Sequence, residues 1–484
     1  MGILIQVAQL AWHDRKMNLM ADNLRLIRSL LTMIGPAGTV EDILNWLKTR
    51  NEAVIVDVKL VDFAVMEHWT FEQSSGDLVH ESGKFFAIRG LSVDTDGCSL
   101  VPHWEQPIID QPEVGFLGMI VQEIDGVLCF KLQAKIEPGN LNHVQLSPTL
   151  QATRSNYMQV HKGKVPRYLE YFRNAKQYKI WLDQLQSEQG GRFFRKRNRN
   201  IIIEVKENIP DHEDFIWVTL GQLKQLMQYD NTVNMDTRTV ISGLGWQGND
   251  IVPLLQYASS TYSLGLLASL CPRNVNDQIR TTLYWLSELK TKYSITSRLI
   301  PLKQVAEWQV LEDEIVRKDR LYFRVIGAQI TIANREVASW SQPLVQPMQH
   351  GLCGLIVKFI DGIAHFLVQA KLECGNLDIV ELAPTVQCLT GGYNSGNPNF
   401  LAYILNATPQ QIIYDSNQSE EGGRFYQEQN RNILVVANED FPTENLPENF
   451  RWLPLWTLRE LLRYNNYLNI QLRSLLAAIN VFTT

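Results

Sequence analysis

Short runs in which hydrophobic and polar residues alternate recur along the chain and predict β-strands. The clearest pair, 118–124 and 127–137, is separated by Asp125-Gly126, the dipeptide most typical of a tight hairpin turn. A further apolar run at 201–206 predicts another strand. The pattern therefore predicts a sheet that contains at least one antiparallel hairpin.

Other segments have apolar residues spaced by three or four positions, which predicts helices. Leu44 and Leu47 follow Thr39, and Asp42 stands three residues after that threonine, which is the spacing of a helix N-terminal capping box. The run 217–227 begins as a strand and ends as an amphipathic helix. Strands mixed with scattered helices, without a regular alternation of the two, predict an α+β fold.

The second half of the chain repeats the first. Residues 118–151 read GMIVQEIDGVLCFKLQAKIEPGNLNHVQLSPTLQ, and residues 354–387 read GLIVKFIDGIAHFLVQAKLECGNLDIVELAPTVQ. A second matched pair lies downstream, with SEQGGRFF at 187–194 and SEEGGRFY at 419–426. Because the matches recur in the same order, they indicate two copies of one unit.

The offset between the copies sets the domain organisation. It is 236 residues between Lys135 and Lys371, far longer than the repeat of a solenoid, which is about 20–50 residues. A tandem duplication of one domain explains this spacing. We expect a first module at 1–240, a connector with one helix at 241–276 and a second module at 277–484.

Length, composition and charge restrict the class of protein. A chain of 484 residues with 45% hydrophobic and 20% charged residues is long and apolar enough for more than one globular domain. Its 45 Lys and Arg against 51 Asp and Glu give a net charge of −6, which argues against a bulk nucleic-acid binder. The six cysteines contain no CxxC pair, so neither a zinc ribbon nor a disulfide scaffold is expected. Without a signal-peptide pattern or a membrane-spanning stretch, we expect a cytoplasmic protein.

Three polar residues share one face of the second hairpin strand. Gln133, Lys135 and Glu137 alternate with Ala134 and Ile136. A lysine and a carboxylate two residues apart on one face can tune each other's pKa and supply an acid and a base. A solvated strand face with a weak ion pair would give the same pattern. The second copy repeats the polar positions as Gln369, Lys371 and Glu373.

A segment dense in hydrogen-bonding side chains follows this strand. Its candidate ligand-binding residues are Asn140, Gln151, Thr153, Arg154, Ser155, Asn156, Tyr157 and His161. Arginine can bind a diphosphate through two hydrogen bonds, and tyrosine and histidine can transfer protons, so the segment suits a phosphorylated, polyhydroxylated ligand. An ordinary polar surface loop is the alternative. The second copy has no match for Arg154 or His161, so only the first copy is expected to be complete.

Both copies contain the pattern Ser-Glu-x-Gly-Gly-Arg-Phe. Paired glycines let the backbone approach a ligand closely and can direct N–H groups at phosphate oxygens. The candidate residues are Glu188, Gly190, Gly191 and Arg192 in the first copy, and Glu420, Gly422, Gly423 and Arg424 in the second, with Asn376 at the position of Asn140. The basic residues at 195–197 are interpreted as a solvated charge run, because the second copy has Gln-Glu-Gln at 427–429.

These motifs together resemble those of the NDP-hexose 2,3-dehydratase family of deoxysugar biosynthesis. The resemblance covers nearly the whole chain, and its motifs lie at 133–140, 145–157, 161–163, 187–193, 369–376, 380–387 and 419–426. It implies two tandem modules akin to Nudix hydrolases, a homodimer and a nucleotide-sugar substrate, usually dTDP-4-keto-6-deoxy-D-glucose. The acidic metal-binding helix signature of Nudix hydrolases is missing, so the scaffold is expected to work without diphosphate hydrolysis.

The resemblance also implies a reaction and candidate roles for the first copy. Glu137 or His161 would remove the C3 proton of the sugar. Tyr157 or Lys135 would protonate the leaving C2 hydroxyl or stabilise the enolate. Because the chain has no GxGxxG directly after a predicted strand, and no HExxH or GxSxG motif, we expect acid–base chemistry with no cofactor and no metal.

Ligand and partner expectations complete this interpretation. Arg154 and Arg192 would hold the diphosphate, with Gly190 and Gly191 nearby. The reactive 3,4-diketo-2,6-dideoxy product would require a downstream 3-ketoreductase. Two alternatives remain, a nucleotide-sugar-binding protein without turnover and a metal-dependent nucleotide-sugar hydrolase.

Overall fold

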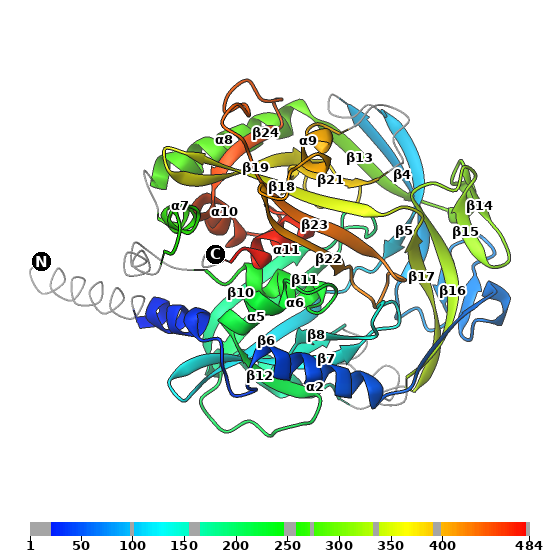
Figure 1. Cartoon of the computed structure of the whole chain (residues 1–484). Helices are drawn as coiled ribbons and strands as arrows, with labels where there is room; N and C mark the ends of the chain where they lie inside the picture. Colours follow the sequence, from blue (N-terminus) through cyan, green and yellow to red (C-terminus); the bar gives the residue numbers. More distant parts are fainter. Residues whose placement is uncertain are drawn as a thin grey trace, which may run out of the picture.

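A seven-stranded sheet forms the centre of each copy in the computed structural model (Figure 1). The structure describes residues 21–96, 101–153, 165–245, 258–271, 275–332, 338–390 and 398–480. The sheet of the first copy contains β6 (Gly115–Ile124), β7 (Val127–Ile136), β8 (Val144–Pro148), β9 (Leu150–Ala152), β10 (Lys179–Ser187), β11 (Arg197–Glu204) and β12 (Phe215–Thr219). Its order is β10-β11-β6-β7-β12, with β8 on β7 and β9 on β6.

The predicted hairpin is confirmed as β6 and β7. Asp125 and Gly126 have φ values of 50° and 76°, which are left-handed conformations that a two-residue hairpin turn requires. The strand predicted at 201–206 is confirmed as part of β11, which runs parallel to β6. All other pairs in this sheet are antiparallel.

The sheet of the second copy has the same plan. It contains β18 (Gly351–Ile360), β19 (Ile363–Lys371), β20 (Glu381–Ala383), β21 (Val386–Leu389), β22 (Ile412–Ser419), β23 (Gln429–Val436) and β24 (Phe450–Pro454). The central neighbours β22-β23-β18-β19 match β10-β11-β6-β7, and β23 is again parallel to β18. Equal pairings in both halves are what a tandem duplication of one α+β unit predicts.

Helices pack against these sheets and between the two copies. They are α2 (Val40–Glu52), α4 (Leu169–Arg173), α5 (Leu220–Leu226), α6 (Met235–Ser242), α7 (Thr261–Leu270), α8 (Val275–Lys292), α9 (Leu401–Leu405), α10 (Leu455–Leu462) and α11 (Ile470–Ala478). Short 3₁₀ turns lie at Phe63–Val65, Ala175–Gln177 and Leu302–Gln304. The predicted capping box is confirmed, because Thr39 and Asp42 exchange hydrogen bonds at the start of α2.

Two smaller sheets join the copies by exchanging a strand. Strand β1 of the first copy pairs with β16 of the second, and β13 of the second copy pairs with β4 of the first (Figure 1). The strands of these sheets are β1 (Val56–Val61), β2 (Trp69–Phe71), β3 (Leu78–His80), β4 (Ala87–Asp96), β5 (His103–Asp110), β13 (Ser294–Ile300), β14 (Trp308–Val310), β15 (Glu314–Arg317), β16 (Phe323–Ile332) and β17 (Ser339–Pro347). Each copy therefore completes a sheet of the other, and the boundaries along the sequence do not separate the copies in space.

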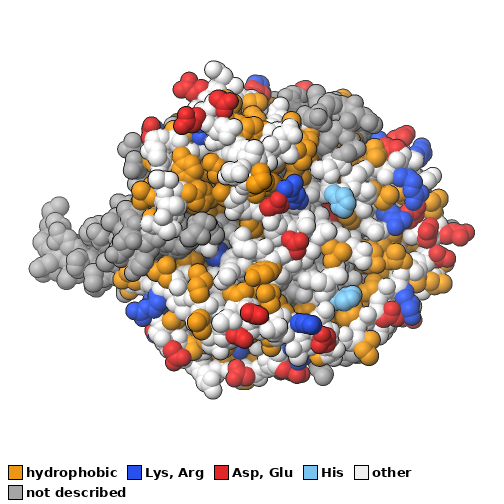
Figure 2. Space-filling model, viewed as in Figure 1, with side chains coloured by type: hydrophobic (Ala, Val, Ile, Leu, Met, Phe, Trp, Pro, Cys, Tyr) orange, Lys and Arg blue, Asp and Glu red, His pale blue; other side chains and the backbone are white. Residues whose placement is uncertain are grey.

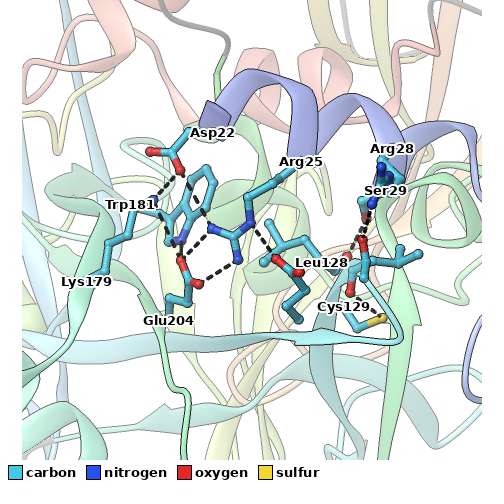
Figure 3. A network of polar contacts seen from close by, with 12 residues as sticks. Asp22, Arg25, Arg28, Ser29, Leu128, Cys129, Lys179, Trp181 and Glu204 are labelled. Carbon is cyan, nitrogen blue, oxygen red and sulfur yellow. Dashed lines mark hydrogen bonds and ion pairs between the residues drawn. The ribbon is translucent and has the colours of Figure 1, made fainter. Parts of the chain in front are cut away.

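The helical residues 21–31 are fixed to the first sheet by a serine (Figure 3). Ser29 Oγ donates a hydrogen bond of 2.5 Å to the Leu128 carbonyl and accepts one of 2.8 Å from the Leu220 N–H. In the second copy, Ser269 of α7 makes the same pair of bonds, to Ala364 and Leu455. The helix predicted within 241–276 is therefore present as α7. Its hydrogen bonds are made to strands and helices of the second copy, as those of residues 21–31 are made to the first.

The largest hydrophobic core is shared by both copies. It includes Leu223 and Leu226 of α5 together with Leu458 and Leu461 of α10, all less than 2% exposed. On the face seen in Figure 2, Lys and Arg side chains are interspersed with Asp and Glu. No helix in the described part of the chain combines the length and apolar character needed to cross a membrane.

Candidate active site

A cavity of about 90 Å³ lies where the end of β7 meets a loop of the second copy. We call this cavity the first site. It is lined by Lys135, Glu137, Gln151, Thr153, Glu188, Lys196, Asp236, Glu421, Gly423 and Arg424, among others. The first site therefore combines side chains from both copies, which the sequence pattern did not predict.

The alternation along β7 brings Lys135 and Glu137 to this cavity as predicted. Gln151 connects the two, because its Nε2 donates to Glu137 Oε1 at 2.7 Å and its carbonyl accepts from Lys135 Nζ at 3.0 Å. Ser147 and Asn234 both donate to Gln151 Oε1, at 2.9 and 3.1 Å, and so fix its amide. Glu137 is only 3% exposed, and its Oε2 has no hydrogen-bond partner among the described residues. One oxygen of this carboxylate is thus held and the other is left for a ligand.

The glycine-rich loops cross between the copies. The Gly139 N–H donates to the Gly422 carbonyl at 2.8 Å. A Cβ on Gly139 would lie 1.7 Å from the Phe425 carbonyl oxygen, and one on Gly422 would lie 2.1 Å from Asn140 Oδ1. The paired glycines predicted a close backbone approach to a ligand. In the structure, the backbone of this loop instead lies close to a turn of the other copy.

The reciprocal crossing places the first-copy loop at the second copy. The Gly375 N–H donates to the Gly190 carbonyl at 2.7 Å, and a Cβ on Gly190 would lie 2.0 Å from Asn376 Oδ1. Arg192 was predicted to hold the diphosphate in the site of the first copy, with Gly190 and Gly191 nearby. The structure places them instead at the equivalent second-copy position, which we call the second site. The physical reason is that each Gly-Gly-Arg loop packs on the turn of the opposite copy.

Arg424 takes the place in the first site that was predicted for Arg192. Its guanidinium lies 4.2 Å from the ring centroid of Phe86 and donates to its neighbour's carbonyl, Gly423 O, at 2.8 Å. Arg192 makes the matching contact with Phe323, also at 4.2 Å. Both arginines are oriented by an aromatic ring of the other copy.

Buried carboxyl groups surround the first site. Burial raises the pKa of Glu421 to about 8, helped by the charges of Glu137 and Glu188 and opposed by Arg424 and Lys196. Burial raises the pKa of Asp236 well above its usual range, with Glu188, Glu421 and Glu137 adding to the effect. The pKa of Glu188 is also raised by burial, although it accepts a 2.7 Å hydrogen bond from Asn198. Burial therefore favours the protonated form of all three carboxyl groups.

Sequence reasoning missed Asp236, Lys196 and Glu421 as site residues. Asp236 lies on α6. The one feature of the sequence that could have identified it is that the second copy has Gln471 at the equivalent position. The interpretation of 195–197 as solvated charge is wrong for Lys196, which is 6% exposed and donates to the Glu113 carbonyl. Burial lowers the pKa of this lysine.

A larger cleft of about 690 Å³ adjoins the first site and shares Lys135 and Gln151 with it. Gln133, Arg167 and His212 also line this cleft. Its volume is in the range that binds small-molecule ligands. The cleft is therefore a neighbouring space in which a ligand that reaches Lys135 could lie.

Several candidates are not tested by this geometry. Arg154, Ser155, Asn156, Tyr157 and His161 lie outside the described residues. Asn140 lies at the turn, where its Nδ2 donates to the His143 carbonyl at 3.0 Å. Within the described ranges, no three His, Cys, Asp or Glu side chains are grouped as they would be around a metal ion.

The sequence model of the NDP-hexose 2,3-dehydratases matches residues 40–244 and again residues 279–479. The chain belongs to this family. Two matched regions also confirm the duplication. A dTDP-4-dehydro-6-deoxy-alpha-D-glucopyranose 2,3-dehydratase of Saccharopolyspora spinosa is 44% identical over 439 residues, which cover 90% of each chain. An enzyme of the same name from Amycolatopsis orientalis is 40% identical over 468 residues, 94% of this chain and 93% of the relative.

The second site of this dehydratase-family chain keeps the strand geometry of the first. Gln387 Nε2 donates to Glu373 Oε1 at 2.9 Å, and Lys371 Nζ donates to the Gln387 carbonyl at 3.3 Å. Gln369 donates to the Pro384 carbonyl at 3.0 Å. Glu420 accepts from Gln189 and Asn430, and burial raises its pKa to about 8.

The charged residues around the second site differ from those of the first. Sequence equivalence pairs three first-site residues with changed residues, namely Lys196 with Glu428, Asp236 with Gln471 and Glu421 with Gln189. Glu428 is buried, and burial raises its pKa while Arg192 opposes the shift. The second site therefore lacks one lysine and two carboxyl groups that the first site has.

Proposed function

We propose that this chain is a dTDP-4-keto-6-deoxy-D-glucose 2,3-dehydratase, with its reaction centre in the first site. The observation that carries this proposal is the Lys135–Glu137 pair inside a small cavity that is also lined by the buried carboxyl groups of Glu188, Asp236 and Glu421. Family membership and the activity for which the relatives are named support this substrate. The matched regions span most of the chain, so the proposal concerns the whole molecule.

The chemistry follows from the ketone at C4 of this sugar. That ketone acidifies the hydrogen on C3, so a base can remove the C3 proton and leave an enolate with its charge on the C4 oxygen. The enolate electrons then form a C2–C3 double bond while the C2–oxygen bond breaks, and an acid supplies the proton that makes the departing hydroxide water. The C3 enol finally takes a solvent proton at C2 and becomes a ketone. The net change is loss of one water molecule.

The first site offers groups for these steps. Glu137 is the base, because its Oε2 has no partner among the described residues while Gln151 holds its Oε1. Lys135 lies on the same strand face and stabilises the negative C4 oxygen. His161 is the alternative base and Tyr157 the alternative acid or enolate donor, as the sequence suggests.

Binding of the nucleotide diphosphate belongs to the cleft next to the first site. Arg167 lines that cleft, and Arg154 comes directly after Thr153, which lines the first site, in the sequence. Arg424, rather than Arg192, is the glycine-loop arginine available to an anionic group in the first site. Charge-assisted hydrogen bonds from arginine to phosphate oxygens would fix the sugar against Glu137.

The assembly and partners are part of the same proposal. The reactive diketo product requires a 3-ketoreductase that consumes it, and the chain acts as a homodimer in the cytoplasm. The second module has an accessory role, because its site differs in three charged positions. A scaffold akin to that of Nudix hydrolases, as well as the absence of bound nucleic acid, remains a prediction from sequence.

Proton NMR with dTDP-4-keto-6-deoxy-D-glucose in D₂O tests the proposal. The expected product, trapped by a 3-ketoreductase and NADPH, is a 2-deoxy sugar with solvent deuterium at C2. Substrate that binds but stays unchanged would instead favour a binding protein. Release of nucleoside monophosphate on addition of magnesium would favour the hydrolase.

A further inference from the structure

Glu421 is a carboxyl group of the second copy that lines the first site together with the proposed base, Glu137. A Cβ added to Gly423 would lie 2.6 Å from Glu421 Oε1 and 3.5 Å from Glu137 Oε1. The two oxygens are therefore at most 6.1 Å apart, the sum of those distances. Gly423 leaves the space between them open, and all three residues line the first site.

This separation suits two carboxyl groups that act on neighbouring carbon atoms of one sugar. One group must accept the C3 proton and another must donate a proton to the oxygen on C2. Two carboxyl groups about 5–5.5 Å apart act on one sugar in retaining glycoside hydrolases, and the upper limit of 6.1 Å is compatible with such a spacing. The first site thus has the geometry for a base and an acid on one ring.

The surroundings of Glu421 favour the protonated form. Burial raises its pKa to about 8, and Glu137 and Glu188 add negative charge nearby. Arg424 and Lys196 oppose this effect but do not cancel it. A carboxyl group in this condition is a competent proton donor at neutral pH.

We propose that Glu421, contributed by the second copy, is the general acid that protonates the departing C2 hydroxyl in the first site. The inference rests on the proposed dehydratase function. In this step Glu137 has taken the C3 proton, the C2–oxygen bond breaks with its electron pair on oxygen, and the Glu421 proton completes the water. Glu421 is left as a carboxylate and regains a proton from solvent.

The second site provides an internal contrast. Gln189 stands at the equivalent position there, and an amide cannot donate an acidic proton. The second site keeps the Gln387–Glu373 hydrogen bond of the base but lacks the acid. This difference accounts for the restriction of elimination to one of two otherwise similar sites.

The test is Glu421→Gln, followed by NMR for two separate events with the full-length protein. Exchange of the C3 hydrogen for deuterium reports the base, and formation of the trapped 2-deoxy sugar reports the complete elimination. Loss of a general acid is expected to slow elimination by about 100-fold or more. Exchange at C3 is expected to continue within about fivefold of the unmodified protein, because Glu137 is intact. The matched control is Glu439→Gln, which removes an exposed carboxylate of the same copy and should change neither rate.

Two outcomes would overturn the assignment of Glu421. Elimination that continues unchanged in Glu421→Gln excludes it as the acid, and equal loss of exchange and elimination shows a structural role or a role as the base. Absence of both events in the unmodified protein would instead reject the proposed function itself.

A second variant and the pH profile distinguish loss of the acid from a folding defect in Glu421→Gln. Glu421→Asp retains a proton donor and is expected to eliminate faster than Glu421→Gln. In the unmodified protein the rate should fall above about pH 8 as Glu421 loses its proton, and this decline should be absent in Glu421→Gln. A decline that persists in Glu421→Gln would contradict the assignment.

Discussion

The first and second sites have the same backbone plan but different charges. In both, a glutamine carbonyl accepts from the strand lysine and its amide donates to the strand glutamate. Around this shared core the first site has Lys196, Asp236 and Glu421, whereas Glu428, Gln471 and Gln189 occupy the equivalent positions of the second. The comparison shows that the lysine–glutamine–glutamate arrangement has been kept in both copies, while the buried charged residues around it differ.

Crossed loops explain why the second copy persists although its own site has diverged. Glu421 and Arg424 belong to the second copy but line the first site. Removal of the second copy would therefore remove half of the proposed reaction centre. The dependence is built into the backbone, since Gly139 and Gly422 pair directly.

The largest expected difference between the sites concerns their glutamates. Glu137→Gln should reduce turnover by about 1,000-fold or more, because no other described group replaces the base. Glu373→Gln, at the equivalent second-site position, should leave turnover within about twofold. Steady-state kinetics with the coupled ketoreductase measures both. Equal losses would show that both sites catalyse the reaction.

The crossed loops themselves can be broken by adding one methyl group. Gly139→Ala should lower the free energy of unfolding by about 3 kcal/mol, because the new Cβ would lie 1.7 Å from the Phe425 carbonyl oxygen. Gly191→Ala is the control, since nothing lies within 4 Å of its Cβ position. Chemical denaturation measures the change. Similar stabilities of the two variants would argue against the crossed arrangement.

The assignment of Arg424 to the first site and of Arg192 to the second can be tested next. Arg424→Ala should lower kcat/KM by about 30-fold, a loss of about 2 kcal/mol for a charge-assisted contact. Arg192→Ala, which affects the second site, should lower it by less than about threefold. A larger effect from Arg192 would return that residue to the first site.

The smallest expected difference concerns stability against pH. Because the pKa of Asp236 is raised in the folded state, its contribution is fully present below the unfolded pKa and is lost as pH rises through the folded pKa. Asp236→Asn should therefore match the unmodified protein below about pH 3 and be more stable at pH 8. Gln471→Asp should show the opposite trend. Urea unfolding at several pH values checks both, and a pH-independent difference would contradict the explanation.

Local features of the fold could be predicted from the sequence because they depend on neighbouring residues. The Asp125-Gly126 hairpin, the Thr39 cap and the shared face of Lys135 and Glu137 follow from periodicity and turn chemistry alone. The duplication could also be predicted, because the two copies retain long identical motifs.

Contacts between the copies could not be predicted in the same way. Both copies carry the Gly-Gly-Arg loop, so the sequence is identical whether each loop packs on its own copy or on the other. For the same reason, the sequence does not predict that β1 and β13 each pair with a strand of the other copy. Asp236 lies about 100 residues from Lys135 along the chain, and only the change to Gln471 distinguished it. The sequence does not show which residues of one copy lie close to which residues of the other.

The exchanged strands have a consequence for how the molecule arose and assembles. A chain with one copy would present an open sheet edge, and two such chains would close each other's edges as a symmetric pair. Joining the copies in one polypeptide makes this encounter intramolecular and independent of protein concentration. It also removes the requirement that both halves be identical, so each gene segment can change separately. Covalent linkage thereby allows the two halves of a once symmetric pair to take on different functions.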